Sequence, residues 1–169
     1  EIRASDAAVR EVVGELDPIK VQAGALTRFT YGLRPHLEEG DSGFDRVEIS
    51  AVAARLDSVC EVRIDGLTSS FAVESLEERR AVISFPRIGH DLTDAIIEVV
   101  FDAQALRYGS AFTARIVDSR RPFDVGQPVL AGDAVDEMFS DRVWIETTAD
   151  VNSVLEVEVS PVVVTPNGD

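Results

Sequence analysis

Hydrophobic and polar residues alternate with a period of two along most of this chain. In residues 27–34, for example, Phe29, Tyr31 and Leu33 fall on one face, and polar residues or glycine fall on the other. Successive side chains of a β-strand point to opposite faces, so this alternation predicts a strand with one buried and one solvated face. The same pattern predicts strands in six further segments: 46–50, 61–65, 80–85, 112–116, 143–147 and 155–160.

Residues 96–101 depart from this alternation, since Glu98 is their one charged residue in an otherwise apolar run. A run of this kind is typical of a strand that is covered on both sides, or of a central strand beneath a loop. A buried helix is the alternative, but the run is short and rich in β-branched residues, which favours the strand.

Short turn sequences rich in Gly, Pro, Asp and Ser separate the predicted strands. They recur every 8–15 residues or so, roughly the spacing typical of a β-sandwich or barrel. We therefore expect an all-β fold, an antiparallel β-sandwich that is Ig-like or jelly-roll-like, with at most one or two short helical turns at 134–139 and 92–95. Residues 1–164 form a single domain in this interpretation, with residues 1–24 as an N-terminal strand arm and residues 165–169 as a linker to a following domain.

The composition is that of a folded chain with one core. Of the 169 residues, 45% are hydrophobic, which suffices for a core without a metal or a disulfide. The longest apolar runs are strand-sized, so no membrane insertion is expected. The lone cysteine, Cys60, leaves no intrachain disulfide, which fits a cytoplasmic protein or an exported bacterial module. Because the sequence opens at Glu1, without Met or a signal peptide, we expect it to be a processed piece of a longer chain.

The chain is strongly acidic, with 31 Asp and Glu residues against 16 Lys and Arg residues and a net charge of −15. Such a surface repels the phosphates of nucleic acids, so no DNA or RNA partner is expected. It suits a soluble extracellular protein, and it leaves spare carboxylates for a hard cation such as calcium. Solubility alone also accounts for the excess of acidic residues.

Residues 40–45 support a calcium hypothesis. Asp41 and Asp45 supply two carboxylates and Ser42 a hydroxyl, while Gly40 and Gly43 let the backbone wrap inward, as a cation with oxygen ligands requires. The alternative is a turn in which the Asp and Ser side chains bond their own backbone. Weaker calcium candidates lie in two other places: Asp133, Asp136 and Asp141, and Asp150 with Asn152.

Trp144 is the candidate ligand-binding residue. It falls out of phase with Val143 and Ile145, so its ring is expected to point outward beside Arg142 and Glu146. An exposed ring in that position could stack on a sugar or on a partner protein. Alternatively, residues 133–140 cover it.

Residue types that commonly act in catalysis form no recognisable motif in this sequence. His36 and His90 lie in predicted turns, without the short spacing to other ligands that a zinc site needs. Cys60 begins an alternating strand and is expected in the core, and no Gly-x-Ser-x-Gly elbow occurs. A triad of Ser, His90 and Asp91 or Asp94 stays open, because triads are assembled in space. We interpret adjacent carboxylates as solvated loop charges, since neighbours on a strand point to opposite faces: Glu38 with Glu39, Glu77 with Glu78, and Asp136 with Glu137.

The C-terminal residues 162–169, Val-Val-Val-Thr-Pro-Asn-Gly-Asp, carry a resemblance. They resemble the opening of Ig-like domains related to the flagellar hook-capping protein, and of C-terminal sorting modules in secreted bacterial proteins, which begin with a short apolar strand and a Thr-Pro-Asn-Gly-Asp-Gly turn. Segments 19–33 and 40–49 are similar to β-sandwich modules that precede such tails. The chain departs from the full pattern because it ends at Asp169, before the second Gly; the alternative is that Pro-Asn-Gly is a common turn sequence.

The resemblance implies an extracellular or cell-surface protein in which this domain is a spacer or an interaction unit. Our first hypothesis is therefore a non-catalytic structural or adhesive module of an exported bacterial protein, with no cofactor unless calcium binds. Its partners would be neighbouring domains of the same chain, and a glycan or a surface protein. The alternatives are a carbohydrate-binding module with a structural calcium and, thirdly, a hydrolase built on a sandwich.

Overall fold

The computed structural model describes residues 11–121, 123, 125–135 and 142–148. These residues form β-strands joined by turns, and their one helix is a single 3₁₀ turn, η1 (His90–Leu92). The strands are β1 (Glu11–Asp17), β2 (Lys20–Gln22), β3 (Leu26–His36), β4 (Phe44–Val52), β5 (Ala54–Ile64), β6 (Leu67–Thr68), β7 (Ala72–Glu77), β8 (Arg80–Ile88), β9 (Ile97–Ala105), β10 (Ser110–Val117), β11 (Gln127–Pro128), β12 (Leu130–Ala131) and β13 (Trp144–Thr148).

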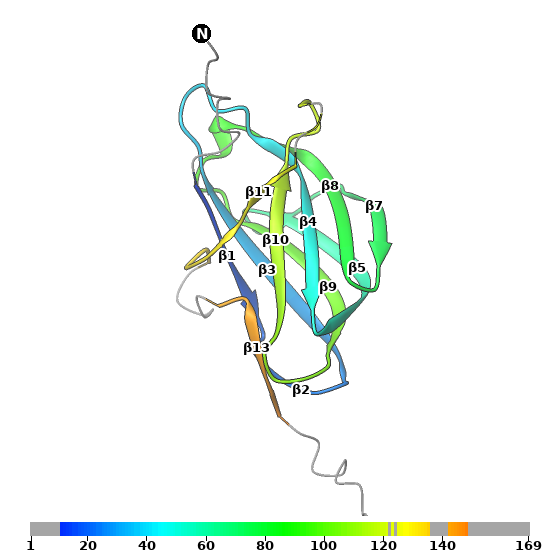
Figure 1. Ribbon diagram of the computed structural model, residues 1–169. Coiled ribbons are helices and arrows are strands. Elements are labelled where there is room, and N and C mark those ends of the chain that lie inside the picture. The colour runs from blue at the N-terminus through cyan, green and yellow to red at the C-terminus, as the bar shows by residue number, and fades with distance from the viewer. Residues whose placement is uncertain (1–10, 122, 124, 136–141, 149–169) are drawn as a thin grey trace, which may run out of the picture.

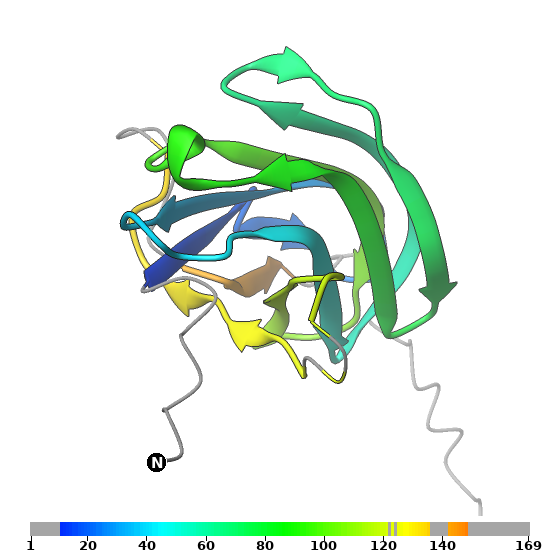
Figure 2. The same cartoon turned by 90° about the horizontal axis from the view of Figure 1, so that it is seen from above.

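The strands build two sheets that pack face to face (Figures 1 and 2). One sheet has the order β12-β1-β3-β9-β5-β6, and the other has the order β2-β13-β10-β4-β8-β7, with β11 pairing to β10. All pairings are antiparallel except β1 with β12 and β2 with β13, which are parallel. The predicted all-β sandwich is therefore confirmed, with two parallel pairings at its margin that the sequence pattern did not predict.

The core consists of the inward-facing residues of both sheets. Phe29 of β3, Phe101 of β9 and Phe112 of β10 meet at its centre, with ring centroids 5.0–5.8 Å apart. Tyr31 lies in the same core, as predicted, and burial raises the pKa of its phenol. The apolar faces predicted from the alternation in β3, β4, β8 and β10 are buried, because each strand can remove its apolar side chains from water only by turning them toward the opposite sheet.

Strand β9 is the central strand of its sheet, as the apolar run at 96–101 predicted. It lies between β3 and β5 and pairs with both along most of its length. Val99, Val100 and Phe101 are all buried, so both faces of this part of the strand are covered.

The first described strand begins and the last described strand ends at opposite ends of the sandwich. β1 is antiparallel to β3 and begins at the upper end in Figure 1, whereas β13 ends at the lower end. Between β1 and β2 the chain passes from one sheet to the other, and β13 then pairs with β2. The second strand, β2, and the last described strand, β13, are thus paired with each other.

Two local predictions are corrected. The helical turn expected at 92–95 lies at His90–Leu92, ahead of the expected position. Cys60 is not a core residue: the register of β5 against β9 shifts between Val59 and Glu61, so Cys60 is the extra residue of a β-bulge and is only half-buried. The predicted strand at 155–160 and most of the predicted turn at 134–139 lie outside the described residues. Among those described, no helix has the length and apolar character needed to cross a bilayer.

Candidate functional site

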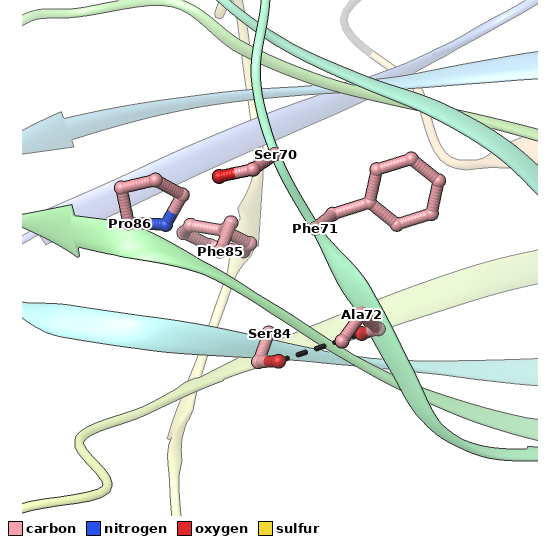
Figure 3. A pocket seen from close by; sticks show the side chains of 6 residues that line it. All are labelled: Ser70, Phe71, Ala72, Ser84, Phe85 and Pro86. Carbon is pink, nitrogen blue, oxygen red and sulfur yellow. Dashed lines mark hydrogen bonds between the residues drawn. The ribbon is translucent and has the colours of Figure 1, made fainter.

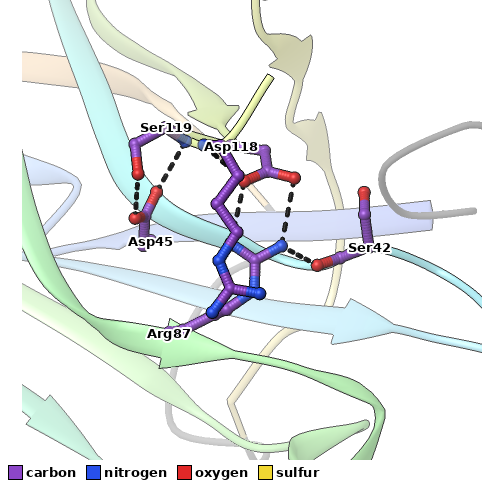
Figure 4. A network of polar contacts seen from close by, with 6 residues as sticks. Ser42, Asp45, Arg87, Asp118 and Ser119 are labelled. Carbon is purple, nitrogen blue, oxygen red and sulfur yellow. Dashed lines mark hydrogen bonds and ion pairs between the residues drawn. The ribbon is translucent and has the colours of Figure 1, made fainter. Parts of the chain in front are cut away.

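A network of polar side chains connects β8, the residues that follow β10 and the segment that leads into β4 (Figure 4). Arg87 of β8 donates two hydrogen bonds to Asp118, which follows β10, with Nη1–Oδ1 2.8 Å and Nη2–Oδ2 3.0 Å. Arg87 Nη2 also donates to the carbonyl oxygen of Ser42. One residue further along, Ser119 donates from its backbone N–H (2.9 Å) and from its hydroxyl to the carboxylate of Asp45. We call these five residues the latch.

The ion pair of the latch favours the charged forms of both Arg87 and Asp118. Asp118 is 1% exposed, so its charge is stable only because it is paired. Hydrogen bonds from the Arg87 guanidinium, and after them one from the Arg120 backbone N–H, hold the pKa of Asp118 below its usual range despite burial. The same ion pair raises the pKa of Arg87. Both shifts favour the ionised forms of Asp118 and Arg87 near neutral pH, so the latch holds a fixed ion pair.

The two predicted calcium ligands lie at this end of the fold, each with a protein partner. Asp41 Oδ2 accepts a hydrogen bond from the Glu38 backbone N–H at 2.7 Å, a local contact of the kind that the alternative turn would make. Asp45 belongs to the latch. Within the described part of the chain, no three His, Cys, Asp or Glu residues are grouped so that they could hold a metal ion. Of the weaker candidates, Asp136, Asp141, Asp150 and Asn152 lie outside it. Calcium binding at Asp41 and Asp45 stays a prediction.

Trp144 lies on the outer face of its sheet at the opposite end of the sandwich. It is 36% exposed, and its ring points outward, as the out-of-phase position in the sequence predicted. Most of residues 133–140, the alternative cover for this ring, lie outside the described residues. The guanidinium carbon of Arg142 lies 4.6 Å from the centre of its ring, and Arg142 also donates to Glu146 at 3.0 Å. The ring of Tyr108 lies at 6.2 Å, tilted by 56°. Since Arg142 covers one face of the indole, a sugar would have to stack on the other face or displace the guanidinium.

Trp144 is one member of a larger apolar area. Val52 of β4 and Trp144 both pair with Ala111 of β10, so the two side chains stand in one row across the sheet. Val52 also lines an open depression of about 480 Å³ together with Leu106. Val52, Leu106, Tyr108 and Trp144 are all exposed, and we call these four side chains the end patch. Arg79 and Arg107 lie at its border, in the lining of the same depression.

A second depression, of about 430 Å³, lies between the start of β7 and the end of β8 (Figure 3). Ser84 donates from its hydroxyl to the Ala72 carbonyl across it at 3.5 Å. The lining is neutral: Ser70, Phe71, Ala72, Ser84, Phe85 and Pro86. None of these six side chains is titratable, so the lining that the structure describes supplies no acid or base.

A third depression, of about 540 Å³, lies on the outer face of the β3-β9-β5 sheet beside Cys60. Arg28 forms a two-bond ion pair with Asp102 here (2.9 and 3.1 Å), and Arg63 pairs with Glu98 at 3.4 Å. These pairs link neighbouring strands across the sheet surface, where exposed ion pairs contribute little stability each.

Among the described residues, the histidines do not form the triad that the sequence left open. His36 lies 3.7 Å from Asp94, and both side chains are more than half exposed. His90 is exposed on η1, and its side chain forms no hydrogen bond to a serine or a carboxylate of the described residues. The adjacent pairs Glu38–Glu39 and Glu77–Glu78 are exposed, as predicted. Asp136 and Glu137 lie outside the described residues.

Comparison with known proteins gives similarity in structure alone. No protein-family description matches the chain. No curated protein matches its sequence. Two similar solved structures are of the major pilin subunit BcpA of Bacillus cereus. The first is a point variant, with 10% identity, 81% of this chain and 40% of that chain covered, and a TM-score of 0.47. The second has 12% identity, coverage of 70% and 38%, and a TM-score of 0.40.

A third is native leukotriene A4 hydrolase from Saccharomyces cerevisiae, with 17% identity, coverage of 61% and 17%, and a TM-score of 0.34. The chain thus spans about two fifths of the length of the pilin subunits that it matches. Similarity at this level concerns the arrangement of strands and says nothing about activity.

Proposed function

We propose that this chain is a non-catalytic structural module of an exported bacterial surface or secreted protein, and that it transmits tension from one end to the other. The observation that carries the proposal is that β1, the first described strand, begins at one end of the sandwich, and β13, the last, ends at the opposite end (Figure 1). A domain with this path can be placed in line between neighbouring domains of the same chain.

The pairing of β2 with β13 gives this path mechanical resistance. The two strands are parallel and in register over three residue pairs, from Lys20–Glu146 to Gln22–Thr148. Backbone hydrogen bonds frame them, from Glu146 N–H to the Ile19 carbonyl (2.6 Å) and from Ala23 N–H to the Thr148 carbonyl (3.2 Å). We call this pairing the clasp.

Tension on the two ends of the chain pulls β2 and β13 in opposite directions along their common axis. The hydrogen bonds of the clasp are then strained together and must break together. Each contributes only about 1 kcal/mol at equilibrium, but their simultaneous rupture opposes unfolding more strongly than rupture one after another.

The external location of the protein is proposed on other grounds. The resemblance of residues 162–169 to the start of modules in secreted bacterial proteins supports it, and so does the acidic balance of the chain. Antibodies raised against the domain are expected to label intact cells of the source bacterium, or the medium. Labelling that requires permeabilised cells, as for a cytoplasmic control protein, would contradict an exported location.

Two matched proline variants test the mechanical proposal. Ala23 is the second residue of a turn closed by Ala25 N–H and the Gln22 carbonyl (3.2 Å), with Gly24 at φ 77°. Glu39 has the same position in a turn closed by Asp41 N–H and the Glu38 carbonyl (3.1 Å), with Gly40 at φ 96°. Proline is favoured at the second position of such turns, so both variants should fold.

Only Ala23→Pro removes a donor of the clasp, because Glu39 lies outside the sheets. In single-molecule force spectroscopy of the full chain, Ala23→Pro should unfold at lower force than the wild type, and Glu39→Pro should not. Equal forces for the two variants would reject the clasp as the element that resists tension.

Carbohydrate binding is a second candidate function, favoured by the exposed rings of Tyr108 and Trp144. It predicts that a glycan array identifies a ligand. Calorimetric titration with that ligand should show binding to the wild type and no binding to Trp144→Ala. An array without a ligand, or a ligand whose affinity Trp144→Ala leaves unchanged, would remove this candidate.

A further inference from the structure

The end patch is an apolar surface without a partner among the described residues. Val52, Leu106 and Tyr108 are each more than half exposed, and the ring of Trp144 stands in the same row as Val52. Single exposed apolar side chains are ordinary, but a group of four, two of which (Val52 and Leu106) line a depression of about 480 Å³, is typical of a surface that another segment covers.

The charges at the border of the patch indicate what kind of segment this is. Arg79 and Arg107 line the depression, and neither forms an ion pair with another residue of the described part of the chain. Most arginines elsewhere in that part are paired with carboxylates, as in Arg28–Asp102, Arg80–Glu48 and Arg87–Asp118. In a chain with 31 acidic residues, two unpaired arginines beside an apolar surface favour a partner that is both acidic and apolar.

The residues that follow β13 have this character. Residues 149–169 include four acidic residues and neither Lys nor Arg. Within them, Leu155, Val157 and Val159 alternate with Glu156, Glu158 and Ser160, which predicts a strand with one apolar and one acidic or polar face. With its apolar row on Val52, Leu106 and Trp144, the segment would turn its glutamates outward. The long side chains of Arg79 and Arg107 could reach them there from the border of the patch.

We propose that residues 151–164 of this chain dock on the end patch and cover Trp144. The distance allows it. The chain leaves β13 at Thr148, and β4 lies two strands away across the sheet, about 10 Å. Residues 149–154 span up to about 20 Å when extended, which is enough to bring Leu155 to the far side of the patch.

Trp144 is the only tryptophan of the chain, so its fluorescence reports on this contact directly. In the full chain, the docked segment should shield Trp144 from acrylamide and keep its emission at short wavelength. Val157→Asp places a charge on the apolar face of the segment, and Glu158→Lys reverses a charge on its acidic face. Both variants should raise the quenching constant and shift the emission to longer wavelength, and Glu39→Lys, exposed at the other end of the sandwich, should do neither.

A charge exchange separates docking from general damage. Arg79→Glu with Arg107→Glu should expose Trp144, and adding Glu156→Lys with Glu158→Lys to these two should restore the shielding. Circular dichroism of each variant checks that the sandwich is intact. If Val157→Asp does not fold, the quenching of Glu158→Lys still tests whether the segment covers Trp144.

Three outcomes would overturn the proposal. Quenching constants that are the same for the wild type, Val157→Asp and Glu158→Lys would show that the segment does not cover Trp144. Shielding that increases with protein concentration would assign the patch to a second copy of the chain. Shielding that appears only when a glycan is added would assign it to a sugar. None of these results depends on whether the clasp resists tension.

Discussion

The latch allows the sharpest prediction about stability, because the chain also contains a matched ion pair at its surface. In both pairs an arginine donates two hydrogen bonds to an aspartate: Arg87 to Asp118, which follows β10, and Arg28 to Asp102 of β9. They differ in exposure: the side chain of Arg87 is 20% exposed and that of Asp118 1%, against 66% for Arg28 and 20% for Asp102. Comparing Asp118→Asn with Asp102→Asn therefore tests chiefly the effect of burial.

Asp118→Asn leaves the Arg87 charge largely buried without its counter-charge. Removing one partner of a fully buried pair costs about 3–5 kcal/mol. Here Arg87 keeps some contact with water and the asparagine keeps one acceptor oxygen, so we expect a loss of about 2–3 kcal/mol in the free energy of unfolding. For a chain of this size that loss lowers the Tm by roughly 4–12 °C. Asp102→Asn should cost less than about 1 kcal/mol, because water solvates the arginine that it leaves.

The difference between the wild type and Asp118→Asn should depend on pH. The pKa of Asp118 in the folded chain lies below that of an unfolded aspartate, which is about 3.9. The folded state therefore resists protonation, and the stabilisation is fully present above about pH 4 and disappears as the pH falls through the pKa of the folded state.

Urea denaturation of the full chain, followed by circular dichroism between pH 7 and pH 2, measures these differences. A loss below about 0.5 kcal/mol for Asp118→Asn at pH 7, as for an ordinary surface substitution, would refute the reasoning. An equal loss for Asp102→Asn, or a difference that does not diminish in acid, would refute it as well.

Three further predictions concern single sites. An alanine in the left-handed conformation costs about 1–2 kcal/mol, and Gly40→Ala, with open space around it, should lose about this much free energy of unfolding in the same denaturation assay. Gly43→Ala should lose more, because its Cβ would lie 2.0 Å from the Ile88 carbonyl oxygen. Phe101→Ala should lose about 3–5 kcal/mol, because it removes the ring that contacts both Phe29 and Phe112, and a loss near 1 kcal/mol would contradict the described core. Calcium binding at Asp41 and Asp45 predicts that millimolar calcium raises the Tm of the wild type and not that of Asp45→Ala, and an unchanged wild-type Tm would remove the hypothesis.

The sandwich could be predicted from the sequence because most of its strands have one solvent-exposed and one buried face. In β3, β4, β8 and β10 each apolar residue of the alternation is a core residue, so period and burial carry the same information. The bulge at Cys60 could not be predicted, since a bulge is defined by the register against the partner strand β9, and a single sequence does not contain that register. The parallel pairing of β2 with β13 joins residues more than 120 positions apart and leaves no local pattern either.

The side-chain clusters were predictable only in part. The outward orientation of Trp144 followed from its phase relative to Ile145, and the structure confirms it. The cation–π contact with Arg142 and the contact with Tyr108 depend on two other segments meeting at the same end of the sheet. The latch was missed because Arg87 and Asp118 are separated by 31 positions, and each by itself is one charged residue among many.

The central claim is that the chain resists tension along the line from its entry to its exit, and the direction of pulling tests it most directly. Handles at the two ends of the full chain load the clasp along its strands. Handles on cysteines at Ala72 and Ser84, with Cys60→Ser, separate β7 from β8 one residue pair at a time. We predict that the first geometry requires clearly higher force than the second. A force through the two ends that is equal to or lower than the force that peels β7 away would contradict the account.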